Sequence, residues 1–85
     1  MSTMGNQDRC RWLEAFGKAV KETRLQRGIS QEKLGFQSGL DRTFISHVER
    51  GTRNPTLWSM RKLAHGLDTT ASHLLEMAEK KLPQD

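Results

Sequence analysis

The sequence lacks several features on which common classes of protein depend. Its 85 residues include one cysteine, Cys10, so an intramolecular disulfide is excluded. No apolar run approaches the roughly 18 residues needed to cross a membrane. The N-terminal segment contains no basic stretch followed by an apolar one, the pattern of a secretory signal. We therefore expect a protein of the reducing cytoplasm, with Cys10 as an unreactive thiol.

Patterns for metal or phosphate chemistry are also missing. The histidines His47, His65 and His73 do not have the spacing of a metal site with Cys10, and no glycine-rich phosphate loop precedes a predicted helix. A chain of this length offers no obvious cleft for a substrate. We predict a protein that is not an enzyme and that needs no cofactor and no metal, and we interpret His65 and His73 as ordinary surface residues.

The residues that are present suit one small helical domain. A chain of 85 residues buries only about 60% of the surface that it exposes when unfolded, so it supports a single core. Fourteen Lys and Arg against ten Asp and Glu give a net charge of +4, a mild bias toward anionic partners. Apolar residues recur at steps of three and four, and the alternation typical of strands is missing. The predicted fold class is all-α.

Five short helices are predicted, over about residues 9–27, 31–38, 42–50, 56–67 and 70–80. Glycines that tolerate a left-handed backbone end three of them, and side chains that accept a hydrogen bond from a free backbone N–H begin four of them. The expected glycines are Gly28, Gly39 and Gly51, and the expected caps are Ser30, Asp41, Thr56 and either Thr69 or Thr70. Residues 1–8 are predicted to form a flexible arm, residues 9–80 the domain and residues 81–85 a tail.

The second and third predicted helices have the requirements of a tight helix pair. Two short helices cross closely through a turn only where the residue at the crossing is very small, and Gly35 occupies that position. Gly39 suits the left-handed turn, and the apolar side chain of Leu40 is expected to pack behind it. Ile45 and Val48 then face inward and fix the third helix to the core.

The opposite face of the third helix points to solvent and carries Arg42, Thr43, Ser46 and His47. The major groove of B-DNA is about 12 Å wide and admits one helix. From the first turn of such a helix, Arg42 can donate two hydrogen bonds to N7 and O6 of guanine, and Thr43 and Ser46 add weaker preferences. His47 is either a further base contact or a solvated residue where the helix tilts out of the groove.

These features resemble the helix-turn-helix unit of the phage repressor and Cro type, the Xre-like family. The resemblance covers about residues 16–78 and depends on Gln31, Gly35, Gly39, Leu40, Ile45 and Val48. The run of residues 40–46, with residues 49–51 and 53–55, resembles in particular the controller proteins of restriction-modification operons. The resemblance implies a five-helix repressor-like bundle, an ion pair between Arg24 and Glu49, and a homodimer that binds an operator with Arg53 near its backbone or groove edge.

A second set of residues is predicted to contact the DNA backbone, which positions a protein without recognising sequence. At the start of the second helix, Gln31 combines a side-chain amide with free backbone N–H groups and the positive end of the helix dipole. The full set is Ser30, Gln31, Phe44, Arg50, Thr52, Arg53 and Asn54. For Arg50 and Arg53 the alternative interpretation is solubilising charge.

A dimer is expected because one domain of this size touches only about four or five base pairs, too few to select one site in a bacterial genome. Two copies on a two-fold axis double the site and place the half-sites about 34 Å apart. The predicted dimer interface consists of Trp58, Leu74, Leu75, Met77 and Ala78. Two alternatives stay open: Leu74 and Leu75 both enter the core of one copy, or Trp12 and Trp58 cover its edge.

The predicted function is therefore a sequence-specific, double-stranded DNA-binding transcriptional regulator of a bacterium or phage, of the controller kind. No membrane and no small-molecule ligand are expected as partners. The alternative is the same fold as an antitoxin or coactivator-like module whose partner is another protein. A polar or acidic third helix would favour that alternative, whereas Arg42 and Thr43 with Ser46 favour DNA.

Overall fold

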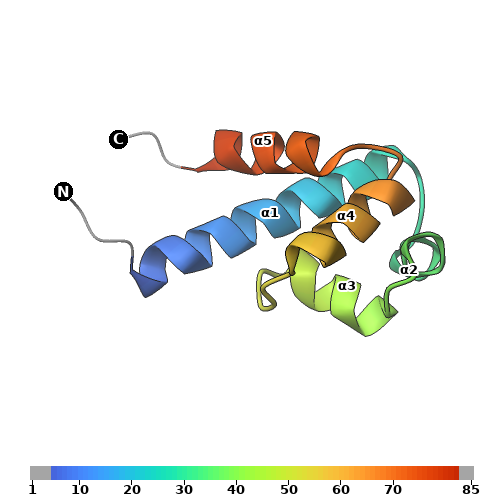
Figure 1. Ribbon diagram of the computed structural model, residues 1–85, viewed down its shortest axis with the longest axis horizontal. Coiled ribbons are helices and arrows are strands. Elements are labelled where there is room, and N and C mark those ends of the chain that lie inside the picture. Colours follow the sequence, from blue (N-terminus) through green and yellow to red (C-terminus); the bar gives the residue numbers. More distant parts are fainter. Residues whose placement is uncertain (1–4, 83–85) are drawn as a thin grey trace.

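A computed structural model describes residues 5–82 of the chain, and within them it contains five helices and no strand. The helices are α1 (Asn6–Gln26), α2 (Gln31–Ser38), α3 (Arg42–Glu49), α4 (Leu57–Gly66) and α5 (Ala71–Lys81). Figure 1 shows α5 lying along α1, with α3 on the opposite side of the molecule and α2 at the end far from both termini. The predicted all-α class and the order of five helices are confirmed.

The predicted helix ends are confirmed to within one residue for α2 to α5. The side chains of Ser30, Asp41, Thr56 and Thr70 accept hydrogen bonds from the backbone N–H groups of Lys33 (3.0 Å), Thr43 (2.8 Å), Ser59 (3.0 Å) and His73 (3.1 Å). Of the two candidates for the start of α5, the cap is thus Thr70. The predicted left-handed glycines Gly28, Gly39 and Gly51 have φ angles of 69°, 72° and 75°.

The start of α1 differs from the prediction. The helix begins at Asn6 rather than at residue 9, because the backbone N–H of Gly5 donates to the carboxylate of Asp8 at 3.2 Å, and Asp8 opposes the positive end of the helix dipole. The predicted arm therefore does not include residues 6–8, and residues 1–4 lie outside the described part of the chain. Lys81, predicted to begin the tail, is the last residue of α5. The remaining tail residues 83–85 lie outside the described part of the chain.

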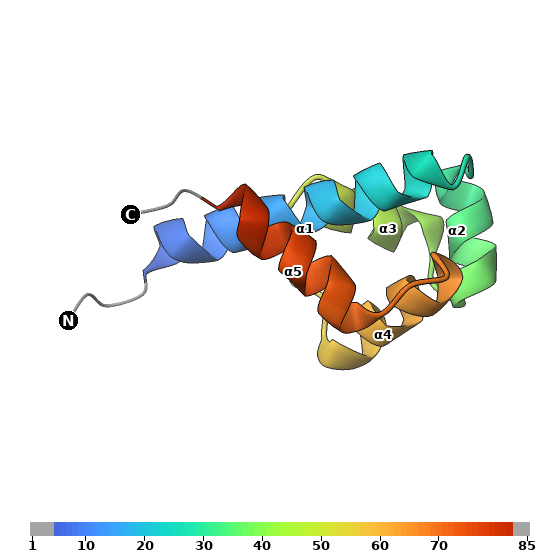
Figure 2. The ribbon, with the colours of Figure 1, turned by 90° about the horizontal axis from the view of Figure 1, so that it is seen from above.

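The core is formed where α1 and α5 meet α2, α3 and α4. Its largest fully buried side chains are Val20, Leu34, Ile45, Val48, Leu63, Leu67 and Leu74. Figures 1 and 2 agree that the first turns of α1 extend past α3 and α4. This extension makes α1 the longest helix, and α5 covers part of it.

Two residues predicted for a dimer interface belong to this core instead. Leu74 and Ala78 are fully buried within the single chain, because the face of α5 that carries them packs on α1. They have no surface left to offer a second copy, so the predicted interface is corrected at these two positions. Leu75 and Met77 are half-buried, and Trp58 is 66% exposed.

Gly17 marks the closest approach of α1 to the end of α3. A Cβ atom at this position would lie 2.3 Å from the carbonyl oxygen of Val48 and 2.7 Å from that of Glu49. Both are backbone atoms, so a larger residue at position 17 can be accommodated only if one helix moves.

Gly17→Ala is therefore expected to lower the free energy of unfolding by about 1 to 3 kcal/mol, the usual effect of overpacking. On an open helix surface the same change stabilises by up to about 1 kcal/mol, so the sign of the effect tests the contact. Urea unfolding followed by circular dichroism measures it. Lys18→Ala, at the exposed neighbouring position, is the control and should change stability by less than about 0.5 kcal/mol. A stabilising Gly17→Ala would contradict the close approach.

Candidate DNA-binding surface

The α2–α3 pair crosses through the small residues that the sequence predicted. A Cβ atom on Gly35 would lie 2.8 Å from the carbonyl oxygen of Leu40, so the turn leaves room for no side chain there. The backbone N–H of Leu40 donates to the carbonyl of Gly35 at 3.1 Å, which closes the turn around the left-handed Gly39. The predicted roles of Gly35 and Gly39 are confirmed.

The two faces of α3 are separated as predicted. Ile45 and Val48 are buried and fix the helix to the core. Arg42 and Thr43 are exposed at its first turn, and Ser46 and His47 are half-exposed along the same side. Within residues 5–82 the guanidinium of Arg42 makes no hydrogen bond or ion pair, so its N–H groups are available to a ligand.

The end of α3 carries a small polar cluster. The Nδ1 atom of His47 lies 3.1 Å from the hydroxyl of Thr52 and 3.3 Å from Nη2 of Arg50. Arg50 also donates from Nε to the carbonyl of Ser46 at 3.4 Å. These contacts hold Arg50 along the exposed side of the helix and leave the Nε2 atom of His47 as the ring nitrogen that can meet a ligand.

Arg53 lies above an aromatic ring in the loop that follows α3. Its guanidinium carbon is 5.6 Å from the centroid of the half-buried ring of Phe44. A cation at this distance from a ring face is attracted by the ring electrons. Phe44, predicted to contact the DNA backbone itself, therefore also positions an arginine that can do so.

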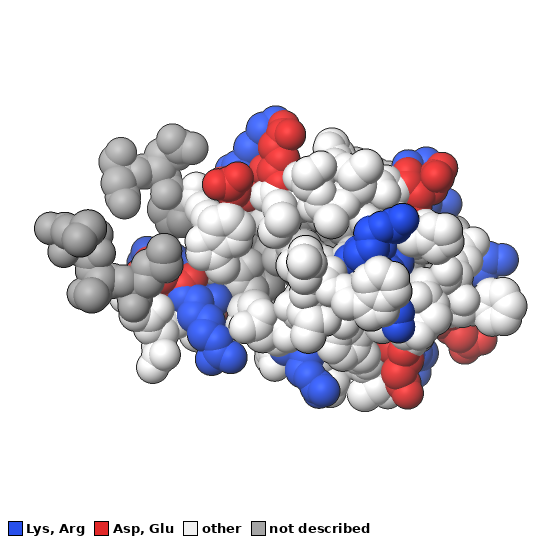
Figure 3. Space-filling model, viewed as in Figure 1, with Lys and Arg blue, Asp and Glu red and all other residues white. Residues whose placement is uncertain are grey.

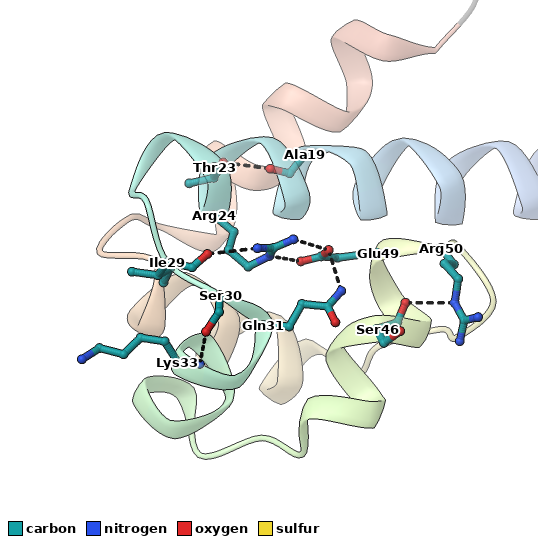
Figure 4. Close-up of polar contacts among 10 residues, drawn as sticks. All are labelled: Ala19, Thr23, Arg24, Ile29, Ser30, Gln31, Lys33, Ser46, Glu49 and Arg50. Atoms are coloured by element: carbon teal, nitrogen blue, oxygen red, sulfur yellow. Dashed lines mark hydrogen bonds and ion pairs between the residues drawn. The ribbon is translucent and has the colours of Figure 1, made fainter.

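A buried ion pair joins α1 to the end of α3 (Figure 4). Arg24 donates from Nε to Glu49 Oε2 at 2.6 Å and from Nη2 to Glu49 Oε1 at 3.0 Å. It also donates from Nη1 to the carbonyl of Ile29 at 2.9 Å. The hydrogen bond to Glu49 raises the pKa of Arg24, burial opposes this, and the charge of Glu49 adds to the increase. The pair that the family resemblance implied is present.

Gln31 is drawn into the same network. Its side-chain nitrogen donates to Glu49 Oε1 at 3.0 Å, as Figure 4 shows. The amide predicted to meet a DNA phosphate thus has a partner inside the protein. The hydroxyl of Ser30 likewise accepts from the N–H of Lys33. At the start of α2, the free backbone N–H groups and the helix dipole are what remains to attract an anion.

Charge over this surface is mixed. Residues 30–55 contain four basic and three acidic residues, which leaves a net charge of +1. On the face that Figure 3 shows, Lys and Arg are interspersed with Asp and Glu and form no single basic patch. Binding by this surface would therefore depend on individually placed side chains more than on bulk charge.

Two further properties of the described residues bear on function. No group of three or more His, Cys, Asp or Glu residues between positions 5 and 82 is placed to hold a metal ion. None of the helices in the same range combines the length and the apolar character required to span a bilayer.

Comparisons with known proteins match the segment that contains the α2–α3 pair. The family described as helix-turn-helix matches residues 20–74. Control protein C.BamHI from Bacillus amyloliquefaciens is 44% identical over 62 residues, 72% of this chain and 76% of the relative. The crystal structure of the restriction-modification controller protein C.AhdI from Aeromonas hydrophila has a TM-score of 0.71 at 47% identity, covering 73% of this chain and 94% of that one.

A further solved structure contains DNA. The tetramer of the restriction-modification controller protein C.Esp1396I in complex with its natural 35 base-pair operator has a TM-score of 0.76 at 37% identity. The match covers 82% of this chain and 92% of that one.

Proposed function

Because the chain belongs to the helix-turn-helix family, and within it to the control proteins of restriction-modification systems, we propose that it binds a pseudo-palindromic DNA operator as a homodimer and thereby regulates transcription. The observation that carries the proposal is the exposed first turn of α3, where Arg42 and Thr43 project from a helix whose opposite face is fixed to the core. The relative C.Esp1396I binds its operator as a tetramer.

Base recognition is assigned to α3. With this helix in the major groove, the guanidinium of Arg42 donates to N7 and O6 of a guanine. Thr43 offers a hydroxyl and a methyl group to the neighbouring base pair, and Ser46 offers a hydroxyl one turn further along. His47 meets the groove edge through its Nε2 atom, since its Nδ1 atom is held by Arg50 and Thr52.

Backbone contacts are assigned to both sides of the groove. The segment after α3 supplies two positive charges and several hydrogen-bond donors, from Arg50, Thr52, Arg53 and Asn54. On the other side, the start of α2 at Ser30 and Gln31 presents backbone N–H groups to a phosphate. Phe44 supports Arg53 from below. These contacts set the register of the helix and carry no sequence information.

Selection of bound sequences from a random duplex pool tests the proposal. The expected result is two half-sites of related sequence whose centres lie about 34 Å apart, one turn of B-DNA. An unselective pool would contradict operator binding and would favour a protein partner for the same fold.

Affinity for the selected duplex is expected to fall steeply with salt. If Arg50 and Arg53 of each protomer neutralise phosphates, four contacts give a slope of about −3.6 in log K against log salt, or a loss of roughly 100-fold between 50 and 200 mM. A gel-shift titration at several salt concentrations measures the slope, with a scrambled duplex as the control. A flat response would contradict the assigned backbone contacts.

A further inference from the structure

The polar cluster at the end of α3 surrounds one ring nitrogen of His47. The Nδ1 atom of this half-buried ring lies 3.3 Å from Nη2 of Arg50 and 3.1 Å from the hydroxyl oxygen of Thr52. In a neutral histidine one ring nitrogen carries the proton and donates, and the other accepts. The groups around Nδ1 therefore determine whether Nε2, the nitrogen left for DNA, donates or accepts.

Arg50 can only donate to this nitrogen, because a guanidinium has five N–H groups and no acceptor. A hydrogen bond from Nη2 forms only when Nδ1 is unprotonated, and the ring proton then lies on Nε2. If Nδ1 carried the proton, two N–H groups would face each other across 3.3 Å. The guanidinium is held beside the ring, because its Nε donates to the carbonyl of Ser46 at 3.4 Å (Figure 4).

Thr52 is compatible with either state of the ring. Its hydroxyl oxygen lies 3.1 Å from Nδ1 and 3.1 Å from the carbonyl oxygen of His47. The hydroxyl has one proton, so it donates to Nδ1, or it donates to the carbonyl and accepts from a protonated Nδ1. The carbonyl also accepts from the backbone N–H of Thr52 at 3.0 Å, so it keeps a partner in both cases. Of the two neighbours of Nδ1, only Arg50 selects one state.

We propose that Arg50 is a positioning residue that fixes the ring proton of His47 on Nε2 and thereby makes His47 a hydrogen-bond donor to DNA. The inference rests on the proposed function and specifies what the second turn of α3 recognises. A donor at Nε2 favours guanine, whose N7 and O6 both accept, over cytosine, whose major-groove edge offers an N–H donor. The Nη1 group of Arg50 takes no part in its contacts with His47 and Ser46, so it can meet a phosphate while Nη2 holds the ring.

The position of the ring proton can be measured by nitrogen NMR in the free protein, at about pH 8.5 where imidazole is neutral. The wild type should carry the proton of His47 mainly on Nε2. In Arg50→Ala the hydroxyl of Thr52 can accept from Nδ1–H, so the proton should move toward Nδ1. The ratio of Nδ1–H to Nε2–H should rise about 2-fold to 10-fold, the change that one hydrogen bond of ordinary net strength gives.

Two further variants show that the effect belongs to this contact. Arg53→Ala removes a neighbouring positive charge that lies over Phe44, and it should leave the ratio at His47 unchanged. Adding Thr52→Val to Arg50→Ala removes the acceptor for Nδ1–H, so the ratio should return toward the wild-type value. His65 and His73, exposed on α4 and α5, serve as internal references in the same spectra. A wild type protonated on Nδ1, or an unchanged ratio in Arg50→Ala, would overturn the proposal.

Base preference provides a second measurement, by selection from a random duplex pool. His47→Ala identifies the base pair that His47 contacts, as the position at which the wild-type preference for guanine disappears. At that position Arg50→Ala should shift the preference toward cytosine or adenine, whose amino groups donate to an unprotonated Nε2. Arg53→Ala should weaken binding and keep the preference for guanine. An Arg50→Ala variant that binds more weakly but keeps this preference would reduce Arg50 to a phosphate contact and overturn its positioning role.

The two measurements separate this inference from the proposed function, because the NMR experiment contains no DNA. A ring proton that moves in Arg50→Ala, in a chain whose wild type selects no duplex, would support the control of His47 by Arg50 and contradict operator binding. A wild type that selects an operator, with a ring proton that Arg50→Ala does not move, would support operator binding and overturn the positioning role alone.

Discussion

Glu49→Ala is expected to lower the free energy of unfolding by about 3 to 5 kcal/mol, the usual effect of removing one partner from a buried ion pair. The side chains of Arg24 and Glu49 are only 9% and 3% exposed. Glu49 accepts two hydrogen bonds from Arg24 and one from Gln31. Removing its carboxylate leaves a guanidinium charge in the interior with only the carbonyl of Ile29 as an acceptor.

A loss of this size is a large fraction of the 5 to 15 kcal/mol that stabilises a typical protein. It should appear in urea unfolding as a lower midpoint with an unchanged slope. Glu22→Ala is the matched control, because Glu22 accepts from Lys81 at 2.7 Å in a pair whose side chains are 50% and 25% exposed. Such surface pairs contribute about 0 to 1 kcal/mol. If Glu49→Ala and Glu22→Ala lowered the free energy of unfolding equally, the burial of the Arg24–Glu49 pair would not explain the loss.

Replacing both members of the buried pair gives a second comparison. Arg24→Met with Glu49→Leu leaves no uncompensated charge, so it should be more stable than Glu49→Ala alone. The stability of this double variant separates the cost of an unpaired charge from the loss of an interaction. A double variant no more stable than Glu49→Ala would indicate that shape, and not charge, determines the loss.

Most of the fold could be predicted from the sequence because its signals are local. A capping side chain such as Asp41, a left-handed glycine such as Gly39 and the spacing of Ile45 and Val48 each act within one turn of helix. The start of α1 was missed because Gly5 has no side chain to mark a cap. Its signal is the single carboxylate of Asp8, three residues further along.

The outward face of α3 could likewise be predicted, since periodicity separates Arg42 and Thr43 from the buried positions. Periodicity does not reveal which apolar face is covered by the chain itself. Leu74 and Ala78 would lie on the apolar face of α5 whether that face packed against the same chain or against a second copy. They are internal because α5 packs on the extended α1. Periodicity likewise did not reveal what covers Trp58, because an exposed tryptophan can pack against the same chain or against another molecule.

Contacts between distant residues depended on the family resemblance or were missed. Arg24 and Glu49 are 25 residues apart, and no local spacing relates them. The hydrogen bond from Gln31 to Glu49 and the position of Arg53 over Phe44 depend on side-chain conformations that only the packed structure fixes. Both change what these residues can offer to DNA.

Arg42→Ala is expected to have the largest effect on operator affinity. A bidentate arginine–guanine contact contributes about 1 to 3 kcal/mol of discrimination at one base pair. A dimer makes the contact twice, in half-sites far enough apart to act additively. The dimer should therefore lose roughly 2 to 6 kcal/mol, or about 30-fold to 10⁴-fold in affinity for the selected operator. The variant should fold normally, because Arg42 is exposed and unpaired within the described residues.

The pattern of the loss is more informative than its size. Arg42→Ala should tolerate any base at one position of each half-site and keep the wild-type salt slope nearly unchanged. Arg53→Ala should weaken binding to all sequences by a similar factor and reduce the steepness of the salt slope by about 2 per dimer. Arg61→Ala removes another exposed arginine, from α4, and should change neither property. If Arg42→Ala kept the wild-type preference at every base pair, the exposed first turn of α3 would not be the surface that recognises sequence, and the proposed orientation of the protein on DNA would be wrong.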